Sequence, residues 1–255
     1  MEYTPQELMV AAAAREIQDG EVVFVGMRLP LLAFVVAKNS HAPNAVGYFE
    51  CGLVREEPAR EHLYTMGDPP NVLGASWATQ MAYLMGLLAQ GAVHLGFIGG
   101  AQVDRYGNLN TTYIGPYHQP TSRLPGSGGA ADIASLAGRL VMLMPHEKRR
   151  FVEQVDYVTS PGYGTGRGWR EGAGLPRGGP SAIITTLGIL RFDEHGESYL
   201  ANYHPFASAE EVQANTGWAL NLSPDVAPTP EPTPEPTPDE LHIIRAYDPN
   251  GFWTR

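Results

Sequence analysis

The sequence lacks the features of a secreted, membrane-spanning or nucleic-acid-binding protein. Its 255 residues include one cysteine, Cys51, which excludes an internal disulfide and a thiolate metal cluster. No apolar run reaches the roughly 20 residues that span a bilayer, and the N-terminus has no basic start followed by an apolar core. The 17 Lys and Arg against 27 Asp and Glu give a net charge of −10, which argues against nucleic acid and anionic membranes as partners. We therefore expect a cytoplasmic protein.

Several catalytic signatures are also missing. The eight histidines show no pairing at three- or four-residue spacing, so we expect no metal site. No G-x-S-x-G elbow is present, which argues against a serine hydrolase. The glycine-rich segments lack both the G-K-[ST] ending of a P-loop and the G-x-G-x-x-G spacing of a dinucleotide fold.

Apolar runs and glycines alternate along the first hundred residues. Thr4-Pro5-Gln6-Glu7 is a capping box that starts a helix, and we expect Gly20 to end it. The elements expected after it are strands at 21–26, 46–49 and 93–98 and helices at 31–38 and 77–88. This alternation predicts an α/β fold with an open, largely parallel sheet and helices on both faces.

The pattern changes after Gly99. Residues 104–108 have the composition of a tight turn, with Gly107 or Asn108 free to adopt positive φ. Strands are expected at 140–144, 151–158, 183–186 and 189–192, and a capping box at Ser208 predicts a short helix that ends at Gly217. The glycine-rich stretch 162–168 is interpreted as a mobile surface loop with no helix directly after it.

A low-complexity segment of alternating prolines, residues 227–238, interrupts the C-terminal part. Such a composition favours a stiff, solvated polyproline II spacer. We therefore predict a main domain at 1–226, a Pro-rich linker at 227–238 and a C-terminal helix and tail at 239–255 that dock on the main domain.

Glu50 is the residue that points most directly to chemistry. It follows the expected strand Val46–Phe49 and precedes a turn at Cys51-Gly52, so it lies at the end of a buried strand. Open α/β folds bind ligands at this edge of the sheet. The alternative is a carboxylate that caps a turn or pairs with a lysine. Cys51 could also be a nucleophile, but no histidine lies locally to activate it, and a free cysteine is by default a small buried residue.

Gly126 to Asp132 is a second candidate segment. Its clustered glycines allow a ligand to approach the backbone, and the short helix expected at 133–137 follows them. A purely structural turn is the alternative for this segment.

Together these segments resemble the B subunit of family I CoA-transferases, most closely the glutaconate CoA-transferase branch. The resemblance covers nearly the whole chain up to the proline segment. It is carried by the following stretches: Glu50-Cys51-Gly52-Leu53, Phe97 to Asp104, Tyr106 to Thr112, Gly126 to Asp132, His146 to Phe151 and Asp156 to Gly162. The chain departs from the family pattern at Cys51, where serine is expected, and in the proline segment.

The resemblance implies that Glu50 is the nucleophile of a double displacement that passes through a glutamyl-CoA thioester. It implies no permanently bound cofactor, with coenzyme A as the substrate carrier, and an A (alpha) subunit as partner. As candidate oxyanion or CoA-binding positions we take Gly128, Gly129, Ala130, Gly100 and Gln102. The open alternatives are acyl-CoA hydrolysis, ring opening or decarboxylation on the same fold, and a non-catalytic sensing or structural subunit.

Overall fold

The structure, a computed structural model, describes residues 2–175, 177–221 and 229–255. The chain divides into two compact units: the first runs to Phe97 and is completed by Pro234–Arg255, and the second is Ile98–Thr233. These divisions differ from the domain boundaries that we predicted at 226 and 238; residues 227 and 228 lie outside the described residues. In the described part of the chain, none of the helices has the length and apolarity needed to cross a membrane.

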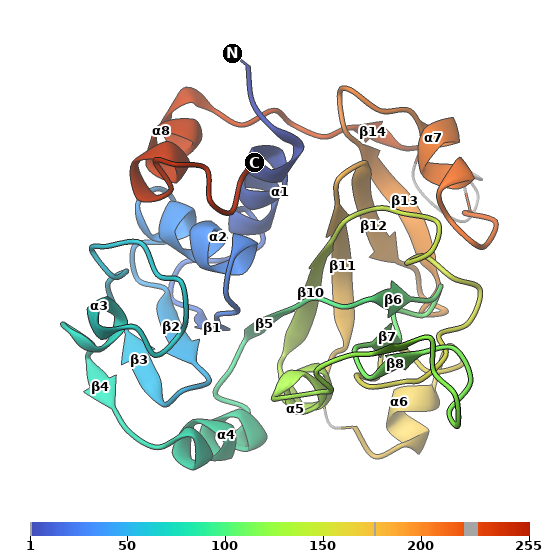
Figure 1. Cartoon of the computed structure of the whole chain (residues 1–255), viewed down its shortest axis with the longest axis horizontal. Coiled ribbons are helices and arrows are strands. Elements are labelled where there is room, and N and C mark those ends of the chain that lie inside the picture. Colours follow the sequence, from blue (N-terminus) through green and yellow to red (C-terminus); the bar gives the residue numbers. More distant parts are fainter. Residues whose placement is uncertain (1, 176, 222–228) are drawn as a thin grey trace. The chain divides into compact units, whose positions relative to one another are not determined.

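The first unit contains most of the helical residues. Its elements are α1 (Pro5–Ala14), β1 (Val22–Phe24), α2 (Leu29–Lys38), β2 (Val46–Phe49), β3 (Leu53–Arg55), α3 (Pro69–Val72), β4 (Trp77–Ala78), α4 (Met81–Gln90), β5 (Leu95–Ile98) at its boundary, and α8 (Pro238–Tyr247). The predicted capping box is confirmed at α1, where the Thr4 hydroxyl accepts from the Glu7 amide at 3.1 Å and the Glu7 carboxylate accepts from the Thr4 amide at 2.9 Å. Helices α1, α2 and α8 pack against one another (Figure 1).

The strands of the first unit follow the order β5-β1-β2-β3-β4. Both neighbours of β1 run parallel to it, whereas β2–β3 and β3–β4 are antiparallel. Phe24 of β1 pairs with Tyr48 on one side and with Gly96 on the other. The carboxyl ends of β1, β2 and β5 therefore share one edge of the sheet, as the sequence predicted.

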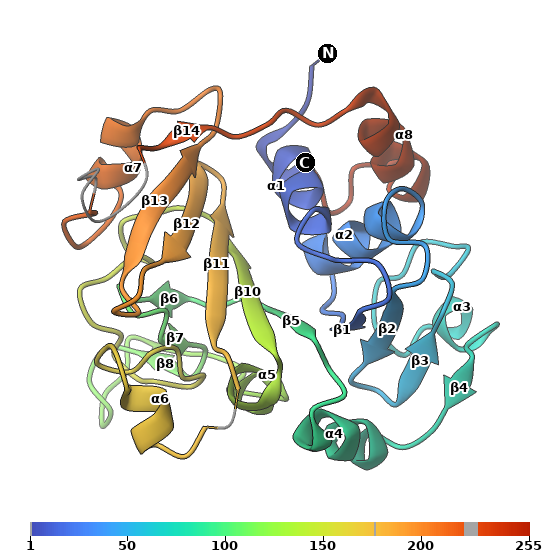
Figure 2. The same cartoon turned by 180° about the vertical axis from the view of Figure 1, so that it is seen from behind.

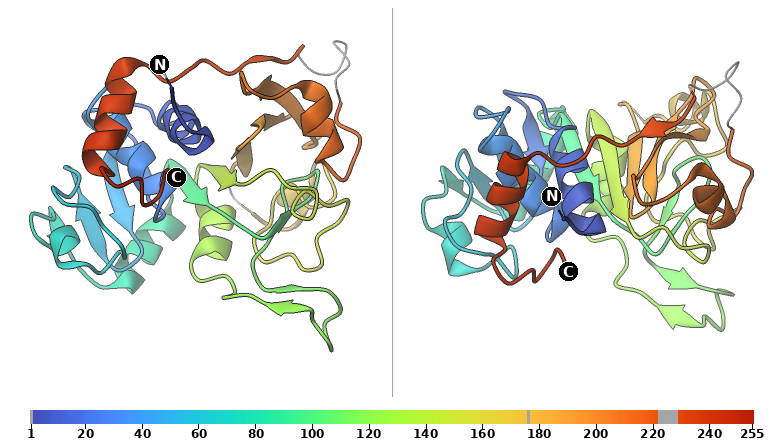
Figure 3. Two further views of the ribbon diagram at one scale, coloured as in Figure 1. Left: turned by 45° about the horizontal axis from the view of Figure 1, so that its top comes forward. Right: turned by 90° about the horizontal axis from the view of Figure 1, so that it is seen from above.

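The second unit is built mainly from strands. Its elements are β6 (Gln102–Val103), β7 (Leu109–Asn110), β8 (Tyr113–Ile114), β9 (Ser122–Arg123), α5 (Ala130–Leu136), β10 (Arg139–Met144), α6 (Trp169–Gly172), β11 (Pro180–Thr185), β12 (Gly188–Phe192), β13 (Ser198–Tyr203), α7 (Ala209–Ala214) and β14 (Glu231–Pro232). Strands β10 to β14 lie side by side in chain order (Figure 2), with β10–β11 and β13–β14 parallel and the two pairs between them antiparallel. The β8–β9 hairpin projects from the body of this unit (Figure 3). The predicted α/β class is confirmed.

Several local predictions were wrong, including the end of the first helix, which is at Ala14 and not at Gly20. Trp77–Ala78 is not helical but forms strand β4, and the helix starts at Met81. Residues 151–158 are not a strand, because only Phe151 makes an isolated bridge, to Val103. Helix α7 starts at its Ser208 cap as predicted, since the Ser208 hydroxyl accepts from the Glu211 amide, but it ends at Ala214 before Gly217.

The glycine-rich stretch 162–168 is held by Asn108, contrary to our prediction of a mobile loop. The Asn108 side chain donates to the Gly164 carbonyl at 2.8 Å and accepts from the Gly162 and Gly164 amides at 3.1 and 3.2 Å. Helix α6 follows Gly168 directly, so the expectation of no adjoining helix was also wrong. The tight turn itself is confirmed, with Gly107 at φ +70°.

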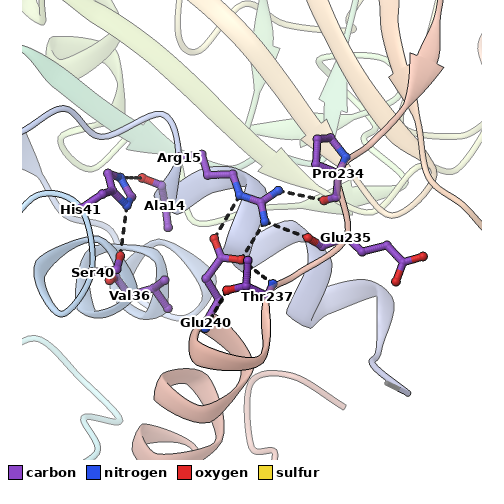
Figure 4. A network of polar contacts seen from close by, with 9 residues as sticks. All are labelled: Ala14, Arg15, Val36, Ser40, His41, Pro234, Glu235, Thr237 and Glu240. Atoms are coloured by element: carbon purple, nitrogen blue, oxygen red, sulfur yellow. Dashed lines mark hydrogen bonds and ion pairs between the residues drawn. The ribbon is translucent and has the colours of Figure 1, made fainter.

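The described part of the proline segment, residues 229–238, is partly packed. Thr233 and Pro236 are buried, and β14 pairs with β13, so the expectation of a wholly solvated spacer was wrong. Arg15 donates to the carbonyls of Pro234 and Glu235 at 2.8 and 2.9 Å and pairs with the Glu240 carboxylate at 2.7 Å (Figure 4). These contacts attach α8 and the preceding residues to α1 within the first unit.

Candidate active site

Glu50 is the first residue of the turn that joins β2 to β3. Phe49 before it is buried, and the Gly52 amide closes the turn by donating to the Phe49 carbonyl at 2.9 Å. Gly52 has φ +102°, a conformation that favours glycine, and its carbonyl accepts from the Thr79 amide at 2.7 Å. The backbone around Glu50 is therefore fixed on both sides, and the Glu50 side chain is half-buried.

The loop after β1 lies next to this turn. The Val25 amide donates to the Tyr48 carbonyl at 2.8 Å, which continues the parallel register beyond the end of β1. Gly26 and Glu50 each follow the paired residues Phe24 and Tyr48 by two positions. A β-carbon at Gly26 would lie 3.4 Å from the Phe97 carbonyl oxygen, so the loop also follows the end of β5 closely. This end of the sheet, where the carboxyl ends of the parallel strands lie, is where open α/β folds bind ligands.

Cys51 has few of the properties of a nucleophile. Its thiol donates to the Met66 carbonyl at 3.3 Å, and no histidine of the described chain bonds to it. Partial burial raises the pKa of the Cys51 thiol, and the negative charge of Glu50 raises it further. The neutral thiol therefore predominates near neutral pH, and the thiolate is the reactive form. Cys51 is an exposed residue, contrary to the buried default.

Gly100 and Gln102 belong to the start of the second unit, and Gln102 is part of a buried polar network. Its side-chain oxygen accepts from the Asn110 side chain at 2.7 Å and from the Asp156 amide at 3.1 Å, while its nitrogen donates to the Asp156 carboxylate at 3.0 Å. Both ends of the Gln102 amide are thus engaged. Gly100 packs on Leu109, because a β-carbon there would lie 2.6 Å from the Leu109 side chain.

Gly128 and Gly129 form the turn that leads into α5, and Ala130 is the first residue of this helix, which starts three residues before the expected position 133. Gly128 is exposed with φ +48°, and Gly129 is the residue before the first helical position. The Ala130 amide donates to the Ser127 carbonyl at 2.9 Å, so it is already used within the turn. All five candidate oxyanion or CoA-binding positions are in the second unit, whereas Glu50 is in the first.

One residue of the loop after β1 was missed by the sequence analysis. Arg28 lies in the loop after β1, two residues beyond Gly26, and has φ +69°. Its guanidinium stacks over the ring of Trp253, with 4.9 Å between the guanidinium carbon and the ring centroid. The arginine directly after Val25-Gly26-Met27 was a usable signal, since basic side chains at this edge can bind anionic ligands.

The described residues contain no group of three or more His, Cys, Asp or Glu side chains placed to hold a metal ion. The side chains at the carboxyl ends of β1 and β2 include the Arg28 guanidinium and the Glu50 carboxylate. A carboxylate fixed in this way can act as a nucleophile or a general base.

Comparison with known proteins identifies relatives over most of the chain. A sequence profile of the family described as coenzyme A transferase matches residues 6–215. The B subunit of glutaconate CoA-transferase from Acidaminococcus fermentans is 42% identical over 231 residues, which cover 88% of this chain and 86% of the relative. The B subunit of 3-oxoadipate CoA-transferase from Pseudomonas knackmussii is 37% identical over 226 residues, with the same coverage of both chains.

Solved structures agree with this relationship. The crystal structure of glutaconate coenzyme A-transferase from Acidaminococcus fermentans superposes with a TM-score of 0.92 at 38% identity, covering 100% of this chain and 98% of that chain. The decarboxylase AibA/AibB superposes with a TM-score of 0.84 at 28% identity, covering 98% and 97%.

Proposed function

Since the chain belongs to the coenzyme A transferase family, we propose that it is the B subunit of an enzyme that moves CoA between an acyl-CoA and a small dicarboxylic acid. The observation that carries the proposal is Glu50, a carboxylate held by a fixed turn at the sheet edge. The dicarboxylic substrate class is supported by the two relatives, which are named for glutaconate and 3-oxoadipate.

In the proposed mechanism the Glu50 carboxylate attacks the thioester carbonyl of the acyl-CoA, giving a mixed anhydride and CoA thiolate. The thiolate then attacks the glutamyl carbonyl of the anhydride, which releases the first acid and leaves a thioester between CoA and Glu50. A second acid enters and the steps reverse. CoA is thus a substrate carrier, with no permanently bound cofactor. A carboxylate is a weak nucleophile, so positioning by the β2–β3 turn and stabilisation of the oxyanion must provide most of the acceleration.

We keep Gly128, Gly129, Ala130, Gly100 and Gln102 as proposed oxyanion or CoA-binding positions. Among our five candidates, the Ala130 amide and the Gln102 side chain already have partners within the chain. The Gly100 and Gly128 amides are therefore the better donors to test, and each such donor contributes about 3–4 kcal/mol to a transition state of this type.

We further propose that the chain acts with an A subunit. Both relatives named above are B subunits, and the decarboxylase is named for two components, AibA and AibB. Large apolar side chains are exposed along the segment from Tyr64 to Tyr83 of the first unit, which would suit such a partner; they are Tyr64, Val72, Leu73, Trp77, Met81 and Tyr83. Cys51, a free and exposed thiol, is compatible with the cytoplasmic location that we propose.

Decarboxylation is the second candidate, because AibA/AibB shares the fold at 28% identity. Hydrolysis or ring opening of an acyl-CoA, and a non-catalytic subunit, are the remaining alternatives. Glu50 favours transfer over a sensing or structural subunit, because neither of these needs an attacking carboxylate, and an assay with and without an acceptor acid separates transfer from hydrolysis, ring opening and decarboxylation.

The test uses the chain purified together with its A subunit. Glutaryl-CoA without an acceptor acid should leave CoA joined to Glu50, visible as a mass increase on the peptide that contains it, and borohydride should then inactivate the enzyme. Glu50→Ala should abolish both the adduct and transfer, while Cys51→Ser should be mild. Release of free CoA or CO₂ with no requirement for an acceptor acid would instead establish a hydrolase or a decarboxylase.

A further inference from the structure

Arg28 has an unusual backbone for its residue type. Among the residues that the structure describes, it is the one non-glycine residue with positive φ, at φ +69° and ψ −125°. L-residues reach this conformation only at a cost, and such strain is frequent at functional sites. Glycine would suit the backbone better than arginine at this position, so the arginine side chain needs a reason of its own.

The Arg28 guanidinium has no acidic partner. It is exposed, and within the described residues it makes no hydrogen bond or ion pair. It stacks instead on the ring of Trp253. Two other arginines of the first unit do have acidic partners, since Arg15 pairs with Glu240 and Arg245 with Glu7. An arginine without a carboxylate in a chain of net charge −10 retains its full set of donors for a ligand.

The Trp253 ring that supports the guanidinium is itself fixed. The buried Asp248 carboxylate accepts from the backbone amides of Phe252 at 2.7 Å and of Trp253 at 2.9 Å. On the ring side, His62 stacks on Trp253 with 6.0 Å between the ring centroids. The C-terminal tail therefore holds the Arg28 side chain in place, and preorganisation of this kind lowers the entropic cost of binding.

Arg28 and Glu50 share one sheet edge within the first unit. The parallel register pairs Phe24 with Tyr48, the Val25 amide donates to the Tyr48 carbonyl just beyond it, and Arg28 follows three residues later in the loop after β1. Adjacent strands are about 4.8 Å apart. When one carboxyl group of a short diacid reacts at Glu50, the second carboxylate of the same acid is only a few bonds from the reacting group. Arginine binds such a carboxylate through two parallel N–H···O bonds.

From this placement we propose that Arg28 recognises the remote carboxylate of a dicarboxylic acyl group and so determines the acid specificity. This inference rests on the proposed function of the same site. The phosphates of CoA offer the same anionic oxygen chemistry, so the test must separate the two sources.

The test compares two acyl groups of five carbons, glutaryl and pentanoyl, in the complex with the A subunit. For Arg28→Gly, kcat/KM with glutarate as acceptor and acetyl-CoA as donor should fall about ten- to a hundredfold, whereas kcat/KM with pentanoate should change less than about threefold. Arg28→Gly should also keep or raise Tm, because glycine tolerates positive φ, and this excludes misfolding as the cause.

Two further variants serve as comparisons. Trp253→Leu should shift the ratio of kcat/KM for glutarate to that for pentanoate in the same direction by a smaller factor. Arg60→Gln, which alters an exposed arginine elsewhere in the unit, should leave this ratio unchanged.

Equal losses for glutarate and pentanoate would assign Arg28 to the phosphates of CoA and overturn the proposal, as would no loss with either acid. Calorimetric titration with glutaryl-CoA and pentanoyl-CoA provides a readout that is independent of transfer. If the complex transfers CoA to neither acid but Arg28→Gly still weakens glutaryl-CoA selectively, the proposed function fails and the role of Arg28 stands.

Discussion

Gly52 lies directly against the backbone of Thr79: a β-carbon at residue 52 would be 2.2 Å from the Thr79 carbonyl oxygen. The same glycine has φ +102° and follows Glu50 by two residues. A side chain at this position would therefore strain the turn and displace it from Thr79, the residue that follows β4. The geometry of Glu50 depends on the absence of a side chain at residue 52.

We predict that Gly52→Ala lowers activity and stability together. The positive φ alone costs about 1–3 kcal/mol for a non-glycine residue, and the contact with Thr79 can be relieved only if the turn moves. A displacement of about 1 Å at a nucleophile can reduce the rate a hundredfold. Steady-state kinetics and thermal unfolding check both effects. Gly67→Ala is the matched control, because a β-carbon there meets nothing within 4 Å, and Gly52→Ala with wild-type kcat would contradict the prediction.

Glu50→Asp should show how closely the carboxylate is positioned. It keeps the charge but withdraws it by about one C–C bond, so transfer should fall by about a hundredfold without a change in folding. Activity that is unchanged in Glu50→Asp and also in Glu50→Ala would remove Glu50 from the mechanism. Loss of activity in Cys51→Ser with an active Glu50→Ala would transfer the role of nucleophile to sulfur.

Thr233 should stabilise the second unit although it lies in the proline segment. Its hydroxyl oxygen is 2.9 Å from Nδ1 of the buried His204, and its amide donates to the Tyr203 carbonyl at 2.7 Å. Thr233→Val keeps the shape but leaves a buried ring nitrogen without a partner, so we expect a loss of about 1–3 kcal/mol in the free energy of unfolding. Urea denaturation measures this, and Thr229→Val, at an exposed position of the same segment, should change little.

The sequence predicted those features that depend on neighbouring residues. The capping box at Thr4, the strand Val46–Phe49 and the place of Glu50 at its end all follow from local pattern. It failed where a distant partner decides the structure. Residues 151–158 have the apolar content of a strand, but the Phe151 ring is buried against His146, with 3.9 Å between ring centroids, and the segment lacks a neighbouring strand for most of its length.

The structures of the proline segment and of the Arg28 side chain also depend on partners that are distant in the sequence. Proline has no N–H, so a proline-rich segment is expected to stay out of sheets, yet β14 occupies an edge where few donors are needed. The contact between Arg28 and Trp253 joins opposite ends of the chain, and no local pattern could reveal it.

Arg15 should be the main attachment of the C-terminal segment within the first unit. Its guanidinium makes two bonds to Glu240, at 2.7 and 3.0 Å, and two to backbone carbonyls of the proline segment. Arg15→Ala leaves the buried Glu240 carboxylate without its cation, so we expect a loss of about 2–4 kcal/mol. Limited proteolysis should then release the C-terminal segment faster. Glu235→Ala is the control, since Glu235 contacts Arg15 through its carbonyl alone, and equal effects of the two variants would contradict this role.

Two buried histidines should make the protein less stable in mild acid. His146 lies 3.0 Å from the hydroxyls of both Thr185 and Thr216, and His204 lies 2.7 Å from the Thr185 carbonyl. Burial lowers the pKa of His146 to about 3, assisted by repulsion from His204, and lowers the pKa of His204 to about 4. Both rings are therefore neutral in the folded protein at any pH above about 5.

The unfolded chain titrates these histidines near their ordinary value of 6.5. Below that pH the unfolded state binds more protons than the folded state, so the free energy of unfolding falls as the pH falls, whereas above it the full stability is present. Each histidine contributes a slope of at most about 1.4 kcal/mol per pH unit. Urea unfolding between pH 7.5 and 5.0, where exposed carboxylates are still largely ionised, should show this decline. His146→Asn and His204→Asn should each reduce its slope. A wild-type stability that stays constant from pH 6.5 to 5.0 would mean that the two rings gain protons in the folded state as readily as in the unfolded chain.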